Sequence, residues 1–173
     1  GVFGQNGNGL ASNADMTIGT FGKAFGSHGA FLTCSQKMKD YLVATCKGLI
    51  YSTAPSPAII GSISAALDLV PKMKESREKI HCLTKHLKDN LVKLNLNILS
   101  EDSHIISISM KDTSVAYGYQ KFLRDSGFWV KAIFPPTVTK KNTCIRFSIC
   151  AFHDLEDINS LISSLASVPI DNA

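Results

Sequence analysis

A single lysine, Lys23, lies among glycines and phenylalanines in residues 20–29 (TFGKAFGSHG), with no other charged residue within seven positions on either side. Apolar surroundings disfavour the charged form of a lysine, so its neutral amine becomes available as a nucleophile toward a carbonyl group. Covalent attachment of a carbonyl cofactor, pyridoxal phosphate above all, depends on such an amine. The hydroxyl of Thr20, three residues before the lysine, is a candidate anchor for the phosphate of that cofactor.

Two other interpretations of Lys23 compete with this one. The phosphate loop of nucleotide-triphosphate enzymes requires a Ser or Thr directly after its lysine, but Ala24 stands there, and Thr17 occupies the place of its first glycine. A solvated surface position is the usual state of a lysine. The flanking Phe21 and Phe25 and the neighbouring glycines instead indicate close backbone approach around this one.

A second candidate is Arg146, in residues 144–150 (CIRFSIC). Alternation along a strand places Ile145, Phe147 and Ile149 on one face and the arginine on the other. The guanidinium fork suits bidentate capture of a carboxylate, although a solvated strand arginine is the simpler alternative. The chain contains three arginines, and the position of this one inside a predicted sheet favours a binding role.

The elements around Lys23 alternate between short apolar strands and helices, which predicts an α/β layer. The strand predicted at GAFLTC (29–34) has apolar residues on both faces, as expected when helices cover a strand on both sides. A helix with Ser35 as its N-cap follows, and a later helix of small apolar residues is predicted to be buried. The predicted strands are MTIGTF (16–21), GAFLTC (29–34) and GLIYST (48–53), and the predicted helices cover 35–47 and 56–70.

The pattern changes after residue 70. Residues 75–94 place apolar side chains at spacings of three and four, which predicts a long amphipathic helix. Further strands are predicted at 104–110, 128–134 and 144–150. A helix is predicted at 114–127, where Gly127 ends it. Another is predicted at 154–167, with Asp154 as its N-cap and with Leu155, Ile158, Ile162 and Leu165 on one face. The sequence thus predicts two domains, with residues 1–70 belonging to a larger α/β unit and residues 71–173 forming a small α+β unit.

Composition narrows the function classes. The chain has 173 residues, 45% hydrophobic and 18% charged, as in a globular protein with a core. Its net charge of +4 comes from basic residues spread along the chain, which argues against nucleic acid as a partner. The five cysteines have no metal-binding spacing, which predicts reduced thiols in the cytoplasm and no metal site. No segment approaches the length of a membrane span, and the opening Gly-Val-Phe predicts a piece of a longer polypeptide.

Several segments resemble the α-oxoamine synthases, pyridoxal-phosphate enzymes that join an amino acid to an acyl-CoA with loss of CO₂. GTFGKAFGSHGAFL is similar to the family's cofactor-lysine segment, and GVFGQNGNGL, IYSTAPSP and FPPTVTKKNTCIRFSICAFH are similar to other segments in the same order. The resemblance implies an α/β fold. The chain would form the C-terminal part of the aspartate-aminotransferase-like fold (fold type I), which ends in a small α+β domain.

The resemblance also implies roles for individual residues. Lys23 matches the lysine that binds pyridoxal 5'-phosphate as a Schiff base and later moves the Cα proton, and Thr20 matches a phosphate-binding hydroxyl. Ser52 and Thr53 match a segment that reaches the phosphate across the interface of a homodimer with shared active sites. Arg146 matches the arginine that binds the carboxylate of the amino acid.

Within the family, the motif PPTV at residues 135–138 is most similar to members that condense L-alanine with a pimeloyl thioester in biotin synthesis. The acyl donor could be a CoA or an acyl-carrier thioester. Members that make 5-aminolevulinate, 2-amino-3-oxobutyrate or sphingoid bases share the other motifs and remain alternatives.

The family's aspartate on the pyridine nitrogen and its ring-stacking histidine belong to segments upstream of Gly1. The chain is therefore expected to be a piece of the enzyme, to need a partner chain, or to be a truncated product without activity. A module that binds a small phosphate ligand without a covalent bond is a further alternative.

Overall fold

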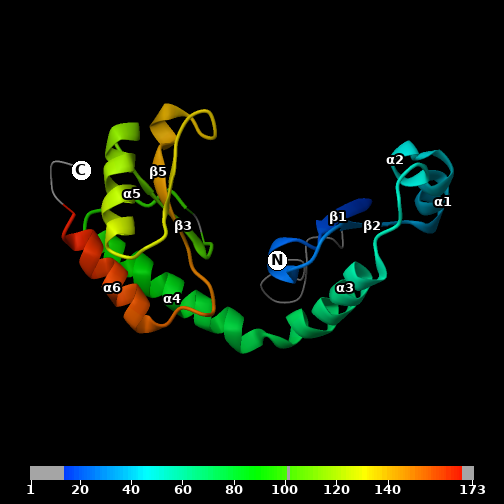
Figure 1. Ribbon diagram of the computed structural model, residues 1–173, viewed down its shortest axis with the longest axis horizontal. Coiled ribbons are helices and arrows are strands. Elements are labelled where there is room, and N and C mark those ends of the chain that lie inside the picture. Colours follow the sequence, from blue (N-terminus) through cyan, green and yellow to red (C-terminus); the bar gives the residue numbers. More distant parts are fainter. Residues whose placement is uncertain (1–13, 101, 169–173) are drawn as a thin grey trace. The chain divides into compact units, whose positions relative to one another are not determined.

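The computed structural model describes residues 14–100 and 102–168. The chain divides into two compact units, Gly1–Met73 and Lys74–Ala173 (Figure 1). The domain boundary predicted after residue 70 falls in the short 3₁₀ helix η3 (Val70–Lys72), close to this division. The predicted loop segment GVFGQNGNGL lies outside the described residues.

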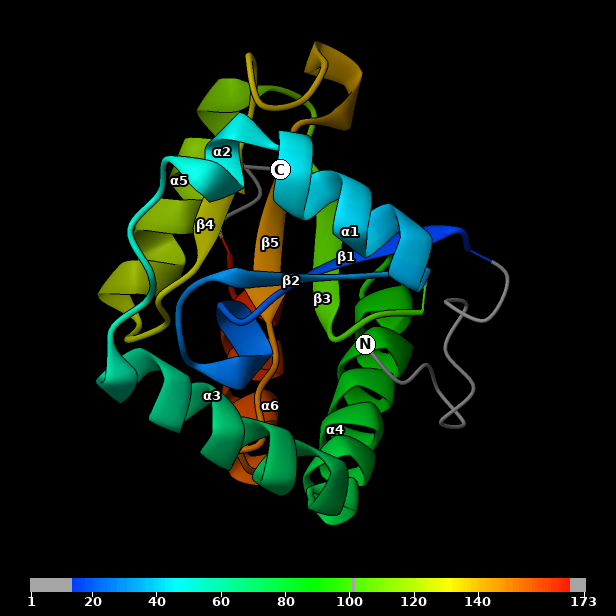
Figure 2. The same cartoon turned by 90° about the vertical axis from the view of Figure 1, so that its right-hand side faces the viewer.

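The first unit is built on an antiparallel pair of strands, β1 (Met16–Thr20) and β2 (Ala30–Cys34), with Met16 opposite Cys34 and Thr20 opposite Ala30 (Figure 2). Both strands were expected from the sequence and are confirmed. The connection between them contains the 3₁₀ helix η2 (Lys23–Phe25). Three helices follow: α1 (Gln36–Thr45), α2 (Lys47–Ile50) and α3 (Pro57–Leu69).

The strand predicted at GLIYST is wrong, because this segment forms α2 and the turn after it. The amides of Leu49 and Ile50 both donate to the carbonyl of Cys46 at 3.0 Å, and Tyr51 donates to Lys47 at 3.0 Å. Apolar and β-branched residues favour a strand only where a neighbouring strand can pair with them. Within the described residues no strand pairs with this segment, so its backbone is satisfied by local helical bonds.

The predicted burial of the first unit is not found among the described residues. Ile18 on β1 is 70% exposed and Leu32 on β2 is 41% exposed, so β2 is not covered on both faces. Helix α3 has no buried residue, although it forms in the predicted segment, where Ser56 caps it. A two-stranded sheet and short helices supply too little apolar surface to cover one another.

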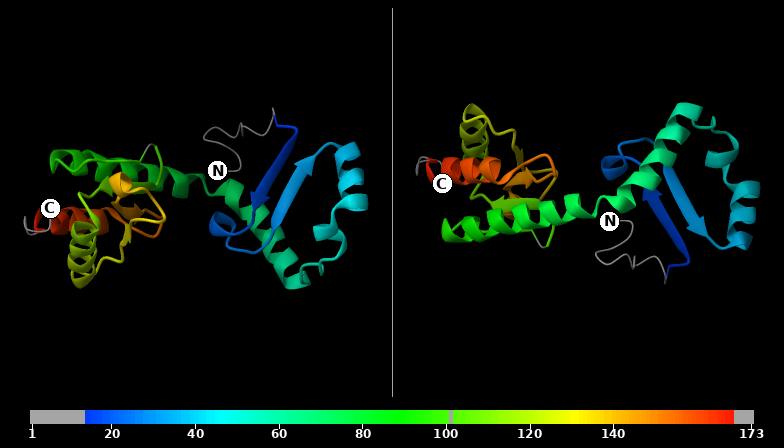
Figure 3. Two further views of the ribbon diagram at one scale, coloured as in Figure 1. Left: turned by 90° about the horizontal axis from the view of Figure 1, so that it is seen from above. Right: turned by 90° about the horizontal axis from the view of Figure 1, so that it is seen from below.

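The second unit has a three-stranded antiparallel sheet in the order β3-β5-β4, formed by β3 (Ile105–Ser109), β4 (Lys131–Ile133) and β5 (Cys144–Ser148). Helices α4 (Lys74–Lys93) and α6 (Leu155–Ala166) pack side by side, and α5 (Thr113–Asp125) also packs on the sheet (Figures 1 and 3). A further 3₁₀ helix, η4, covers Lys140–Asn142. All three predicted strands and all three predicted helices of this unit are confirmed.

The core of the second unit lies between one face of the sheet and the helices. Its fully buried apolar side chains come from both layers, namely Leu87, Leu91, Ile106, Ile108, Leu123 and Ile145. Burial of one such side chain contributes about 1.5–3 kcal/mol, so this cluster is the main source of stability of the unit.

The ends of the helices follow the predicted capping residues. Asp154 accepts a hydrogen bond from the amide of Asp157 at 2.9 Å, and the Asp157 carboxylate accepts one from the amide of Asp154 at 2.9 Å. Gly127 follows α5 with φ 91°, as expected for a residue that ends a helix. On α6, however, Leu161 is buried and Leu155 is 52% exposed, so the predicted inward face is wrong at Leu155.

Among the described residues, no helix is long and apolar enough to cross a membrane.

Candidate active site

Lys23 is the first residue of η2, in the tight connection between β1 and β2. Its backbone φ is 54°, in the left-handed region that non-glycine residues rarely adopt. Four backbone hydrogen bonds hold the connection. Gly26 N–H donates to the Lys23 carbonyl at 2.9 Å, Ser27 N–H to the Phe21 carbonyl at 2.8 Å, Phe21 N–H to the Gly29 carbonyl at 2.9 Å, and Phe25 N–H to the Gly22 carbonyl at 3.4 Å. The surrounding turn therefore fixes the unusual backbone of the lysine.

Three phenylalanine rings pack together at this turn. Phe21 and Phe25 are buried and meet edge to face, with ring centroids 5.7 Å apart and planes at 86°. The Phe31 ring of β2 lies 5.2 Å from that of Phe21. It also crosses Gly19 so closely that a Cβ there would be 2.3 Å from the ring.

The close backbone approach predicted at the glycines 22, 26 and 29 is wrong, and the crowded glycine is instead Gly19. The glycines at 26 and 29 serve another purpose, since their φ values of 61° and 99° are left-handed and their Cβ positions are open. Gly22 also has room for a Cβ, whose nearest neighbour would be the Ser27 carbonyl at 4.0 Å.

The side chain of Lys23 is exposed, so the apolar pocket predicted around its amine is not formed by the described residues. The phenylalanines beside it are buried against one another and leave the lysine outside. Its amine has no hydrogen bond or ion pair within the part of the chain that the structure describes. It is thus a free primary amine on a fixed turn.

The predicted phosphate-binding hydroxyls are also exposed. Thr20 is the last residue of β1, opposite Ala30 and just before the Lys23 turn. Ser52 and Thr53 follow α2, and the Ser52 hydroxyl donates to the Leu49 carbonyl at 3.1 Å. The chain places Thr20 beside the lysine, while the expected contribution of Ser52 and Thr53 to a partner's site stays a prediction.

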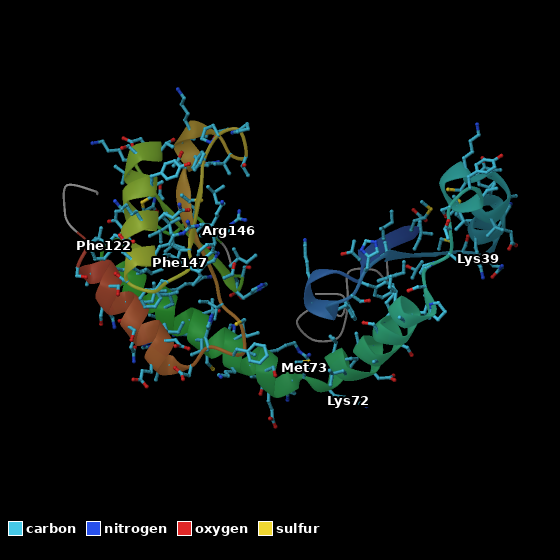
Figure 4. The ribbon with its side chains drawn as sticks, viewed as in Figure 1. Lys39, Lys72, Met73, Phe122, Arg146 and Phe147 are labelled. Carbon is cyan, nitrogen blue, oxygen red and sulfur yellow. The ribbon has the colours of Figure 1, made fainter. Side chains whose placement is uncertain are left out.

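Arg146 lies in the middle of β5, in the second unit. Its side chain is exposed, whereas Ile145 and Phe147 on either side of it are buried, so the predicted orientation is confirmed. Figure 4 shows Arg146 and Phe147 leaving the strand on opposite sides. Cys144, which alternation along the strand puts on the same side as Arg146, is buried. The guanidinium is available for a ligand, because it forms no hydrogen bond or ion pair within the described residues.

The sequence analysis missed Lys131, which pairs directly with Arg146 across β4 and β5. Alternation in the segment FWVKAIF puts the lysine on the face opposite Val130 and Ala132, both buried. That signal was present in the sequence, but the pairing of the two strands was not.

His153 lies at the entry to α6. Its Nδ1 accepts a hydrogen bond from the Cys150 amide at 3.2 Å, which leaves the ring proton of the neutral histidine on Nε2, 3.7 Å from the Cys150 sulfur. Among residues 14–100 and 102–168, no group of three His, Cys, Asp or Glu side chains could hold a metal ion.

Residues 2–165 match the family described as aminotransferase class I and II. The chain belongs to this family. A putative 8-amino-7-oxononanoate synthase of Desulfosudis oleivorans is 37% identical over 169 residues, which cover 96% of this chain and 44% of the relative. The 8-amino-7-oxononanoate synthase of Saccharophagus degradans is 32% identical over 175 residues, covering 97% of this chain and 44% of the relative. The resemblance to α-oxoamine synthases is therefore confirmed, over less than half the length of these relatives.

Solved structures show the same fold. Serine palmitoyltransferase of Sphingomonas wittichii matches with a TM-score of 0.87 at 20% identity, over 98% of this chain and 45% of that one. The 8-amino-7-oxononanoate synthase of Francisella tularensis matches with a TM-score of 0.79 at 21% identity, over 90% of this chain and 46% of that one. A structure of SPT with PLP matches with a TM-score of 0.88 at 22% identity. The predicted fold, part of the aminotransferase-like fold type I, is confirmed.

Proposed function

We propose that this aminotransferase-family chain is the part of a pyridoxal-phosphate-dependent acyltransferase that carries its cofactor lysine, Lys23, and its carboxylate-binding arginine, Arg146. The whole protein would condense an amino acid with an acyl thioester. The observation that supports this most directly is the amine of Lys23, unpaired among the described residues, on a backbone turn held by four hydrogen bonds. A lysine kept in a left-handed conformation, where glycine or asparagine would fit better, indicates that its amine is needed there.

The residues present fit pyridoxal 5'-phosphate. Lys23 offers a primary amine that has no partner in the described part of the chain, and Thr20 offers a hydroxyl at the adjoining end of β1. Thr53 would donate a hydrogen bond to the phosphate in the site of the partner subunit, and Ser52 would do the same once its hydroxyl turns away from the Leu49 carbonyl, so the active form would be a homodimer with shared sites. When bound, the cofactor supplies an electron sink for the bonds at the substrate Cα.

The other tasks fall to side chains of this chain. Arg146 would hold the α-carboxylate of the amino acid through two parallel N–H···O bonds, which fixes how the Cα bonds are oriented. The amine of Lys23 would remove a proton from Cα and later return one, acting as a positioned general base and acid.

For the substrates we propose L-alanine and a pimeloyl thioester, carried by CoA or by an acyl carrier, in a cytoplasmic reaction of biotin synthesis. This choice rests on the names of relatives with 32–37% identity and on the PPTV motif at residues 135–138. The product in those names bears an oxo group next to an amine-bearing carbon and a carboxylate at its far end. Alanine and a dicarboxylic acyl group combine to that product with loss of CO₂.

A different α-oxoamine synthase is the second candidate, since serine palmitoyltransferase shares the fold over 98% of the chain.

Borohydride trapping tests the role of Lys23. The chain is incubated with pyridoxal phosphate, reduced with borohydride and digested, and the cofactor mass is located by mass spectrometry. We expect the label on the peptide of Lys23, with the Lys23→Ala variant unlabelled there. Lys39, also exposed in this unit, is the internal control. Equal labelling of both lysines would contradict the proposal.

A further inference from the structure

One row of residues crosses the open face of the second unit's sheet. Arg146 of β5 is directly opposite Ser107 of β3 on one side and Lys131 of β4 on the other. Directly paired residues of antiparallel strands point to the same side, with Cα atoms about 4.5–5.5 Å apart. The lysine and the arginine therefore stand next to each other on the exposed face.

Among the described residues, nothing neutralises this pair of cations. Neither side chain forms an ion pair or hydrogen bond within the described residues, and the three strands contain no Asp or Glu. On α4, by contrast, Lys74 lies 3.5 Å from Glu78 and Lys85 lies 2.8 Å from Asp89. Like charges directly opposite on a sheet destabilise it, so an anion on this face would relieve a cost that the fold otherwise carries.

The same face offers hydroxyl groups. Ser107 is in the row itself, and Ser148 is two residues beyond Arg146 on the same side of β5. Two cations with hydroxyls and no acid make a surface for negatively charged oxygens. Arg146 suits a planar carboxylate, and the ammonium of Lys131, a point charge on a flexible stem, suits a second anionic group beside it.

We propose that Lys131 binds the distal carboxylate of a dicarboxylic acyl donor while Arg146 holds the carboxylate of the amino acid. Lys131 is then a specificity-determining residue that selects dicarboxylic over plain acyl chains. The inference rests on the proposed function for the role of Arg146 and for the class of donor. It extends that function, because it names the residue that would distinguish a pimeloyl group from an uncharged fatty acyl group.

Binding of free acids to the whole chain tests the inference without any cofactor. Heptanedioate and heptanoate are titrated at low ionic strength and followed by NMR shifts of the sheet amides. We expect heptanedioate to bind about two- to fivefold more tightly, as an added, partly exposed ion pair allows. Lys131→Gln should abolish the difference and leave heptanoate binding unchanged. Lys141→Gln, at an exposed lysine of η4, is the matched control and should keep it.

Three outcomes would overturn the inference: equal binding of both acids by the wild type, an unchanged difference in Lys131→Gln, or phosphate binding as tight as heptanedioate with the same dependence on Lys131. A lysine on an edge strand also discourages pairing with other chains, and that role alone gives the second outcome. Lys131→Glu, which reverses the charge, should make heptanedioate the weaker ligand. The trapping experiment on Lys23 can fail or succeed independently of these titrations.

Discussion

At position 23, the residue that the proposed chemistry requires differs from the residue that the backbone conformation favours. A left-handed backbone costs an ordinary residue about 1–2 kcal/mol, and glycine avoids most of that cost. The same turn already uses glycine at positions 26 and 29, where φ is also positive. The lysine at φ 54° goes against the preference of the backbone, and the proposed chemistry of its amine would account for it.

Replacing this lysine by glycine should consequently make the protein more stable and remove its covalent cofactor. We expect the free energy of unfolding of Lys23→Gly to exceed that of Lys23→Ala by about 1 kcal/mol. In urea titrations, Lys23→Gly should therefore unfold at the higher urea concentration. Both variants lack the amine, so both should fail to bind pyridoxal phosphate covalently and to support condensation in the whole protein. Equal stability of the two variants would show that the turn does not hold residue 23 in the left-handed region.

Arg146 belongs to the same scale, and its charge can be separated from its shape. Lysine keeps the charge and loses the fork, so Arg146→Lys should already weaken amino acid binding. Arg146→Ala should weaken it about ten- to a hundredfold, which is about 1.5–3 kcal/mol for a charge-assisted contact. Titrations of the whole protein with L-alanine and with the acyl thioester check this. A loss that is equal for both ligands would place Arg146 outside the amino acid site.

At the scale of elements, the packing of β2 on β1 depends on Gly19. A methyl group there would overlap the Phe31 ring at 2.3 Å, and moving the ring would disturb its contact with Phe21. We expect Gly19→Ala to cost about 1–3 kcal/mol, as overpacking does, measured by urea unfolding. Gly22→Ala is the matched control, because its Cβ has 4.0 Å of room and its φ is −73°. A similar loss in both variants would mean that backbone entropy, rather than the ring, sets the cost.

Local patterns in the sequence predicted most of these elements. The caps at Ser35 and Asp154 and the amphipathic period of α4 depend only on residues close in the chain, and all are confirmed. The strand predicted at GLIYST was wrong, because strand formation depends on a neighbouring strand that can be distant in the sequence. The pairing of Lys131 with Arg146 was missed for the same reason, since strand register is a long-range property. Lys23 and Arg146 were proposed as site residues from their unusual surroundings, yet the exposure of Lys23 could not be predicted from its apolar neighbours.

At the scale of the whole molecule, the proposal requires two copies of the chain in one active protein. Thr53 is exposed and is proposed to serve the partner's site, while Lys23 serves its own. In the whole protein, Lys23→Ala and Thr53→Ala chains should each be impaired alone. Hybrid dimers formed by mixing them should recover activity, up to about a quarter of the wild-type value if exchange is complete and one intact site forms in each hybrid dimer. No recovery, with subunit exchange verified by mass spectrometry, would contradict shared sites.

The difference in burial between the two units should also appear in the rates of amide hydrogen exchange. The amides of β3 and β5 belong to a sheet with one fully buried face, whereas β1 and β2 leave Ile18 and Leu32 largely in solvent. Native-state hydrogen exchange should therefore be orders of magnitude slower in β3 and β5 than in β1 and β2. Pyridoxal phosphate bound at Lys23 should slow exchange in β1 and β2, because a ligand stabilises the conformation that binds it. The strands that carry the lysine would then owe part of their own persistence to the cofactor.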